Sequence, residues 1–191
     1  MRQTKLAGVG WRRPAWIHRF PGGLCILFTL ALAGAFAATG QNVPRDMMVR
    51  EVHNALVALP FYTVFDDLNA RVEGDSVLLS GQVTRPELKT DAERSVLKVP
   101  GVARVINQIE VLPISPSDEK LRLAEYLAVY GDPSLVEYQH LAAPPIHIVV
   151  KNGAVSLEGA VTSESDKTEA FEVASGVPGV ASLTNQLRVE P

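Results

Sequence analysis

The chain contains a single cysteine, Cys25, among its 191 residues. One cysteine excludes an intramolecular disulfide and a multi-cysteine zinc site, so we expect no disulfide partner. Basic residues are outnumbered by acidic ones, 18 against 21, which argues against a nucleic-acid binder because such proteins usually carry a basic surface. A charged fraction of 20% beside 47% hydrophobic residues excludes a wholly disordered chain.

The first 37 residues contain no acidic side chain but five Lys or Arg side chains. An apolar run, 24–37, follows the basic part and ends in Ala35-Phe36-Ala37, a small-x-small sequence. This order is typical of a secretory signal peptide, and the run is shorter than the roughly 20 residues of a membrane-spanning helix. We predict that 1–37 is a cleavable signal peptide of an exported protein. The alternative is an uncleaved segment that anchors the chain to a membrane.

Removal of this segment changes the charge of the chain. The remaining residues carry 13 basic and 21 acidic side chains, a net charge of −8, and they include no cysteine. Anionic membranes attract clusters of Lys and Arg. The overall charge of the mature chain therefore opposes simple electrostatic docking on such a membrane.

The mature chain contains an internal duplication. Residues 72–111 align with residues 150–189 at a constant offset of 78 without a gap, and 17 of the 40 positions are identical. The longest identical block is Val99–Ala103 against Val177–Ala181. Agreement of this extent indicates one fold present twice, because internal repeats reflect repeated structural units. We place the first copy at 46–112 and the second at 117–190.

Each copy is predicted to form, in order, a helix, two strands, a helix and a strand. In the first copy, apolar residues recur at helical spacing over 46–59, alternate on both sides of a turn at 73–76, and recur at helical spacing again after Pro86. Thr84 and Glu87 have the spacing of a capping box at the start of the second helix. The periodicity therefore predicts a repeated unit that contains both helices and strands.

The second copy repeats this order, with a first helix over about 117–130. Leu123, Leu127 and Tyr130 are predicted to form the buried face of that helix. Ser163 and Asp166 have the spacing of a helix cap. The segment 131–145 is longer than its counterpart in the first copy.

The second copy carries the hairpin Asn152–Val161, followed by Pro178-Gly179-Val180 and Asn185-Gln186-Leu187. This pattern resembles the BON domain, named from bacterial OsmY and nodulation proteins. The resemblance implies an α+β fold of two tandem units, each with two helices packed on a three-stranded sheet. It also implies an OsmY-like protein of the periplasm or cell envelope, linked to osmotic or envelope stress, with phospholipid or envelope proteins as partners. It implies no catalytic residue, and its recurring residues specify the fold. Its structural glycines here are Gly81, Gly101, Gly153, Gly159 and Gly179.

The polar residues that could perform chemistry do not form a recognisable motif. His53 is expected on a solvated helix face, and His147 on the strand face opposite Ile146, without metal-ligand spacing to another histidine. Asp66 and Asp67 are adjacent, so on a strand they would point to opposite faces and form a poor acid–base pair. We therefore expect no enzyme, no metal and no cofactor. A hydrolase would require Asp66, His53 and a hydroxyl group to converge in a cleft.

Two segments depart from the repeat and are candidate partner surfaces. The first places three aromatic residues, Phe61, Tyr62 and Phe65, in one connection, and the second contains Leu135 and Tyr138. Exposed apolar clusters often mark interfaces, although these side chains could also cover the core of their own copy. The leading hypothesis is a non-catalytic protein that associates with envelope lipid or protein. The alternative is a periplasmic adaptor or chaperone-like module that binds protein segments.

Overall fold

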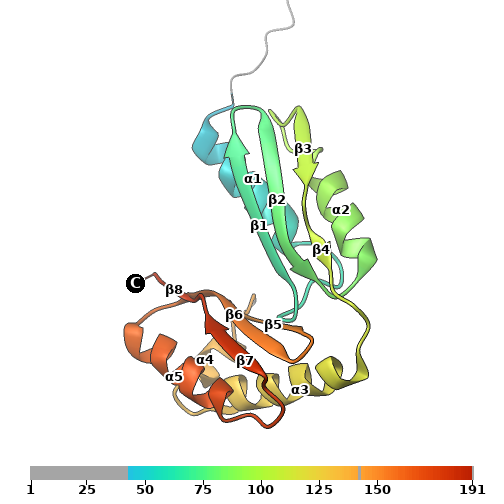
Figure 1. The fold of residues 1–191 in the computed structure, drawn as a ribbon. Coiled ribbons are helices and arrows are strands. Elements are labelled where there is room, and N and C mark those ends of the chain that lie inside the picture. Colours follow the sequence, from blue (N-terminus) through green and yellow to red (C-terminus); the bar gives the residue numbers. More distant parts are fainter. Residues whose placement is uncertain (1–42, 142, 191) are drawn as a thin grey trace, which may run out of the picture. The chain divides into compact units, whose positions relative to one another are not determined.

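The computed structural model describes residues 43–141 and 143–190. The predicted signal peptide and Cys25 lie outside the described residues. Each copy forms an α+β unit (Figure 1). The first copy contains α1 (Arg45–Val57), β1 (Asp67–Glu73), β2 (Ser76–Val83), α2 (Pro86–Val96), β3 (Arg104–Asn107) and β4 (Glu110–Val111). The second contains α3 (Pro116–Gly131), α4 (Val136–Gln139), β5 (Ile146–Lys151), β6 (Ala154–Val161), α5 (Glu164–Ser175), β7 (Ser182–Asn185) and β8 (Arg188–Val189).

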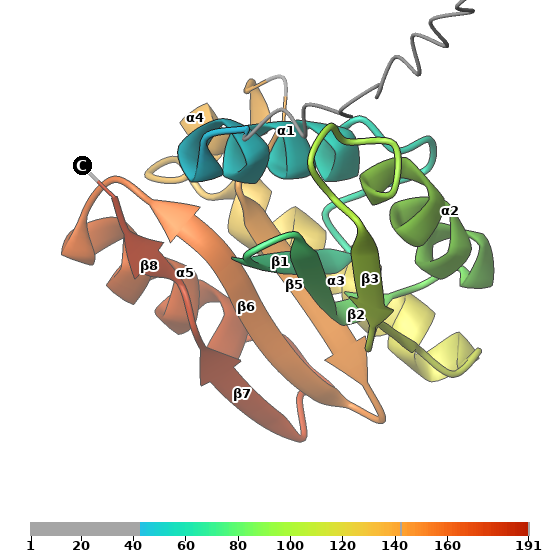
Figure 2. The ribbon, with the colours of Figure 1, turned by 90° about the horizontal axis from the view of Figure 1, so that it is seen from above.

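The two sheets have the same topology. In the first copy β1 pairs with β2 in antiparallel orientation, and β3 and β4 both pair with β2 in parallel orientation. In the second copy β6 is the central strand between β5 and β7, as Figure 2 shows, and β8 also pairs with β6. The predicted α+β fold and element order are confirmed, except that the last strand of each copy is interrupted.

An asparagine that is repeated in the two copies explains this interruption. The side-chain amide of Asn107 donates to the carbonyl of Lys89 in α2 at 2.8 Å, and its oxygen accepts from the amide of Ile109 at 3.1 Å. Asn185 makes the equivalent contacts with Lys167 and Leu187 at the same distances. The two-residue break thus lets one side chain join the last strand to the second helix.

Close backbone contacts explain the central glycine of each hairpin. Gly81 and Gly159 have φ values of 116° and 103°, in the region that side chains rarely adopt. A Cβ atom on Gly81 would overlap the carbonyl oxygen of Asp67. A Cβ atom on Gly159 would overlap the carbonyl oxygen of Pro145. Both glycines therefore allow the neighbouring strand to approach.

The structure corrects the predicted start of α2. Thr84 does not cap this helix: its hydroxyl and its amide both donate to Oδ1 of Asp66, at 2.8 and 2.6 Å. The second predicted cap is confirmed, because the amide of Asp166 donates to Oγ of Ser163 at 3.1 Å. The first copy thus uses Thr84 to satisfy a buried carboxylate instead of a helix end.

The predicted buried face of α3 was wrong for two of three residues. Leu123 and Leu127 are 57% and 63% exposed, whereas Tyr130 is buried as expected. The buried face carries charged side chains beside Leu121 and Val129, namely Asp118, Arg122 and Glu125. Hydrophobic spacing gave the wrong buried face because Asp118 and Arg122 turn inward to hydrogen-bond with backbone groups of the hairpin. Among the described residues, no helix has the length and apolar content needed to span a membrane.

Candidate functional site

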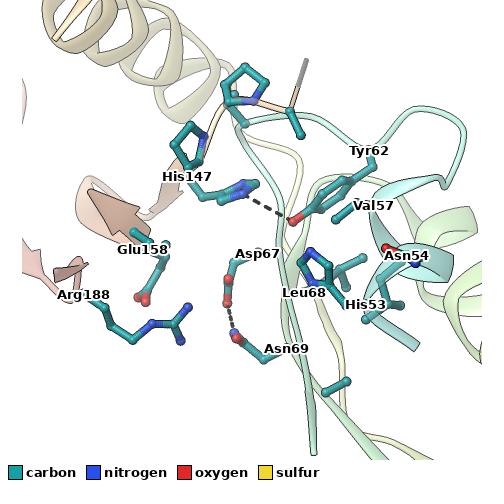
Figure 3. Close-up of a pocket in the computed structure, with 18 of the residues that line it drawn as sticks. His53, Asn54, Val57, Tyr62, Asp67, Leu68, Asn69, His147, Glu158 and Arg188 are labelled. Atoms are coloured by element: carbon teal, nitrogen blue, oxygen red, sulfur yellow. Dashed lines mark hydrogen bonds between the residues drawn. The ribbon is translucent and has the colours of Figure 1, made fainter. Parts of the chain in front are cut away.

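A cleft of about 1080 Å³ lies among the described residues. In the first copy it is lined by α1, by residues 62–64 and by β1. In the second copy it is lined by residues 143–145, His147 and the polar residues of β6 and β8. Figure 3 shows that the two sets of side chains point toward one another. The cleft therefore combines apolar side chains of α1 with titratable groups from both copies.

Tyr62 and His147 lie at one side of this cleft. The Tyr62 hydroxyl lies 3.5 Å from Nε2 of His147, and the ring centroids are 5.5 Å apart (Figure 3). Burial lowers the pKa of His147, although the nearby backbone carbonyls of Asp66 and Thr63 oppose this effect. Burial raises the pKa of the Tyr62 phenol, and the negative charge of Asp67 raises it further. Both rings are therefore neutral hydrogen-bonding groups near pH 7.

Asp67 at the start of β1 has an unusual electrostatic environment. Burial raises its pKa to about 6, and the negative charge of Glu158 adds to this shift. Arg188 opposes the shift, and Nδ2 of Asn69 donates to Oδ2 of Asp67 at 2.6 Å (Figure 3). Arg188 is itself shared, because its Nε donates to Glu190 at 3.1 Å. This part of the cleft therefore has an excess of negative charge.

Such a cluster in a cleft is typical of a functional site, because ligand-binding and catalytic groups often have shifted pKa values. The arrangement that a hydrolase would require is nevertheless not formed. Asp66 is buried, and the hydrogen bonds to its carboxylate come from the amides and hydroxyls of Thr63 and Thr84. His53 is exposed on α1, as expected, and makes no hydrogen bond to Asp66. Within residues 43–141 and 143–190, no group of three or more potential metal ligands is present.

The structure distributes the aromatic residues of 61–65 among different environments. Phe61 is 65% exposed, and the guanidinium carbon of Arg85 lies 4.8 Å from its ring centroid. Tyr62 packs against the core of the first copy, whereas Phe65 packs against the core of the second. Only Phe61 among these three presents a large exposed side chain. A role for Phe61 in partner contact stays a prediction.

The other predicted surface residues are buried in the second copy. Leu135 is fully buried and Tyr138 is 7% exposed. The Tyr138 hydroxyl donates to Asp166 at 2.6 Å and accepts from the amide of Thr162 at 2.9 Å. This contact lowers the pKa of Asp166. Both residues are therefore part of the core, and they do not form an exposed partner surface.

Sequence reasoning missed Glu158 and Arg188, and it treated Asp67 as a solvated strand residue. These three groups come from β1, β6 and β8 and are far apart in the sequence. No local spacing connects them. The available signal was the alternation of strand residues, which places Glu158 and His147 on the same sheet face as opposite partners in the β5–β6 ladder.

Comparison with known proteins identifies the family. A search of the curated proteins finds no match to this chain. Among solved structures, one of CdsD, a structural protein of the type III secretion system of Chlamydia trachomatis, has 14% identity and a TM-score of 0.27, covering 75% of this chain and 92% of that chain. The C-terminal domain of CdsD has 13% identity and a TM-score of 0.27, covering 75% of this chain and 98% of that chain.

The family model of the BON domain matches residues 50–113 and again residues 134–191. The two matches follow the duplication found in the sequence and together span more than half of the 191 residues. The chain therefore belongs to the BON-domain family and contains two BON domains.

Proposed function

We propose that this chain is a non-catalytic, exported protein of the bacterial cell envelope that binds a partner protein segment in the cleft between β1, α1 and the second BON domain. A periplasmic location follows from the predicted signal peptide, and a role in osmotic or envelope stress follows from the resemblance to OsmY-like proteins. The observation that carries the proposal is the cleft itself, which offers apolar side chains of α1, titratable groups and an exposed strand to one ligand.

The charges of the cleft favour a protein segment over a phospholipid headgroup. Asp67 and Glu158 lie close enough for each negative charge to disfavour the other, so a phosphate group would add repulsion. The net charge of −8 on residues 38–191 acts in the same direction. A non-catalytic role is supported by the full occupation of the Asp66 carboxylate by Thr63 and Thr84.

The test is photo-crosslinking from within the cleft. A photoreactive amino acid at position 53, on the exposed part of α1, is expected to form covalent adducts with envelope proteins in cells that produce the full chain. The matched control is position 171 on α5, which is also exposed but does not line the cleft. No adduct from position 53, or equal adducts from both positions, would contradict the proposal.

A second candidate function is direct contact with a membrane surface. It is favoured by Leu123 and Leu127, which lie one turn apart on α3 and are both exposed. Flotation of residues 38–191 with phosphatidylethanolamine–phosphatidylglycerol vesicles tests it. Binding that is lost on Leu123→Ser and Leu127→Ser would support membrane contact, and absence of flotation would exclude it for these lipids.

A further inference from the structure

The edge strands of the two sheets, β1 and β5, occupy equivalent places but differ in their surroundings. In β5 every second residue directs its backbone N–H and C=O away from the sheet. Those groups are largely occupied: the Ile148 amide donates to the Val64 carbonyl at 2.7 Å, and the carbonyls of Val150 and Ile146 accept from Arg122 at 2.8 Å and from Tyr130 at 2.6 Å. The edge of β5 is thus closed by side chains and by a segment of the same chain.

The equivalent edge of β1 is open at Ala70. The offset of 78 places Leu68, Ala70 and Val72 at the positions of Ile146, Ile148 and Val150, and the two ladders have the same register. The guanidinium of Arg45 donates to the Val72 carbonyl at 3.0 Å. In the second domain Arg122 donates to the equivalent carbonyl, that of Val150. Within the described residues, no hydrogen bond reaches the outward amide or carbonyl of Ala70. Residues 69–71 are exposed, whereas residues 148–150 are buried.

Unpaired edge groups of a strand are a template for another strand. Ala70 and Leu68 line the cleft, and the exposed side chains of Val49 and Val57 on α1 line the same cleft. On the other face of β1, Asp67 lies near Glu158 in the region of excess negative charge (Figure 3). Apolar side chains therefore lie on one face of this strand edge. On the other face the carboxylates of Asp67 and Glu158 lie toward the start of β1, whereas Arg71 lies toward its end and pairs with Glu73.

We propose that the edge of β1 at Ala70 binds an extended polypeptide segment as an added strand, in which apolar residues alternate with basic residues. The proposal rests on the proposed function and specifies how the partner binds. Successive side chains of an added strand point to opposite faces, so the apolar ones face Val49 and Val57 and the basic ones face Asp67. A lipid acyl chain has no amide or carbonyl to pair with Ala70, which is why a polypeptide fits this edge better.

The second domain supplies the internal precedent. At the position equivalent to Ala70, the Val64 carbonyl already accepts a hydrogen bond from the strand edge at Ile148. The outward amide at this place in the strand can therefore donate to a backbone carbonyl of another segment, here one in a turn. The same pairing at Ala70 requires a chain that the first domain does not itself provide.

The probe is a blocked hexapeptide of alternating valine and lysine, titrated into the full-length protein and followed by the amide resonance of Ala70. Saturable binding with slowed hydrogen exchange of the Ala70 amide is expected. Backbone N-methylation along one edge of the peptide is expected to abolish binding, and N-methylation along the other edge to leave it unchanged. Equal binding of the two methylated peptides would overturn strand addition.

Two variants at one position provide the matched comparison. Ala70→Pro removes the outward amide without removing a ladder hydrogen bond, and should weaken binding by about tenfold or more. Ala70→Val keeps the amide and should bind like the unchanged protein. Asp67→Asn should weaken binding of the lysine peptide but not of a peptide with threonine in place of lysine.

Circular dichroism verifies that each variant is folded. Unchanged affinity of Ala70→Pro, or no binding of the peptide to the unchanged protein, would overturn the inference. If position 53 still forms adducts with envelope proteins in that case, the proposed function stands and only the mode of binding fails.

Discussion

The backbone amide of Ile148 donates a hydrogen bond of 2.7 Å to the carbonyl of Val64, which joins the strand edge of the second domain to a connection of the first. The next residue, Phe65, continues this contact, and its ring centroid lies 6.1 Å from that of Tyr126 in an edge-on arrangement. Val64 and Phe65 in the connection 61–65 therefore contact the second domain of the same chain. An ion pair between Lys151 and Glu110, at 2.6 Å, also joins the two domains.

The first prediction concerns this contact. Phe65→Ala should destabilise the second domain by about 1–3 kcal/mol, because it removes a partly buried aromatic ring from the core of that domain. Thermal unfolding followed by near-UV circular dichroism measures the effect. Phe61→Ala is the matched control, since its exposed ring contributes little to a core. Equal destabilisation by the two variants would show that Phe65 has no special role.

The duplicated fold could be predicted from sequence because its signals are local. Glycines at the hairpin, alternating apolar residues and the Pro-Gly-Val restart recur at a fixed offset. The face of α3 could not be predicted in this way. Asp118 accepts from the amides of Asn152 and Gly153 at 2.8 and 2.9 Å, so a charged residue takes a buried position that periodicity assigns to apolar ones.

The candidate site could not be predicted because its groups come from both domains. Burial raises the pKa of Asp67, the charge of Glu158 raises it further and that of Arg188 opposes this shift. Both charged residues are about ninety or more positions away in the sequence. Spacing rules detect residues on one helix or strand. They do not detect which strand edge is covered and which is open, since Val64 covers β5 through a contact between domains.

The second prediction concerns the repeated asparagine. Asn107→Ala should cost about 2 kcal/mol, because the carbonyl of Lys89 and the amide of Ile109 both lose a partner in a partly buried place. Denaturant unfolding provides the measurement. Gln108→Ala is the control, since Gln108 is exposed and should change the free energy of unfolding by less than about 0.5 kcal/mol. A loss as large for Gln108→Ala would contradict this role.

The third prediction concerns Glu125, which is fully buried and whose carboxylate oxygens have no hydrogen-bond partner among the described residues. Burial raises its pKa to about 7, so the folded state binds a proton more tightly than the unfolded state. Stability should therefore fall as pH rises from about 4.5 to about 7. Glu125→Gln should remove this dependence and gain about 1–2 kcal/mol at pH 8, a value reduced for solvent screening.

Urea unfolding of both proteins at pH 5 and pH 8 checks this expectation. The curves should nearly coincide at pH 5, where the Glu125 carboxyl is already protonated. Glu119→Gln on the exposed side of α3 is the matched control and should gain no stability at pH 8. A Glu125→Gln variant less stable than the unchanged protein at pH 8 would indicate a partner for the carboxylate.

The fourth prediction concerns the titration of Asp67 in the cleft. Its carboxyl should titrate with a pKa of about 6 by carbon-detected NMR. Glu158→Gln should lower this pKa, because it removes a neighbouring negative charge, whereas Arg188→Gln should raise it, because it removes a positive one. An unchanged pKa in both variants would mean that burial alone sets it.

The fifth prediction uses two glycines of the second domain. Gly159→Ala should destabilise the fold by more than about 2 kcal/mol, because its Cβ would overlap the carbonyl oxygen of Pro145 and its φ of 103° disfavours a side chain. Gly176→Ala is the control: its nearest neighbour, the carbonyl of Val173, would lie 3.4 Å away. That variant should be neutral or slightly more stable, since alanine loses less conformational entropy than glycine. Thermal melts of both variants decide the matter, and a Gly159→Ala protein as stable as Gly176→Ala would mean that β5 can move away from β6 at little cost.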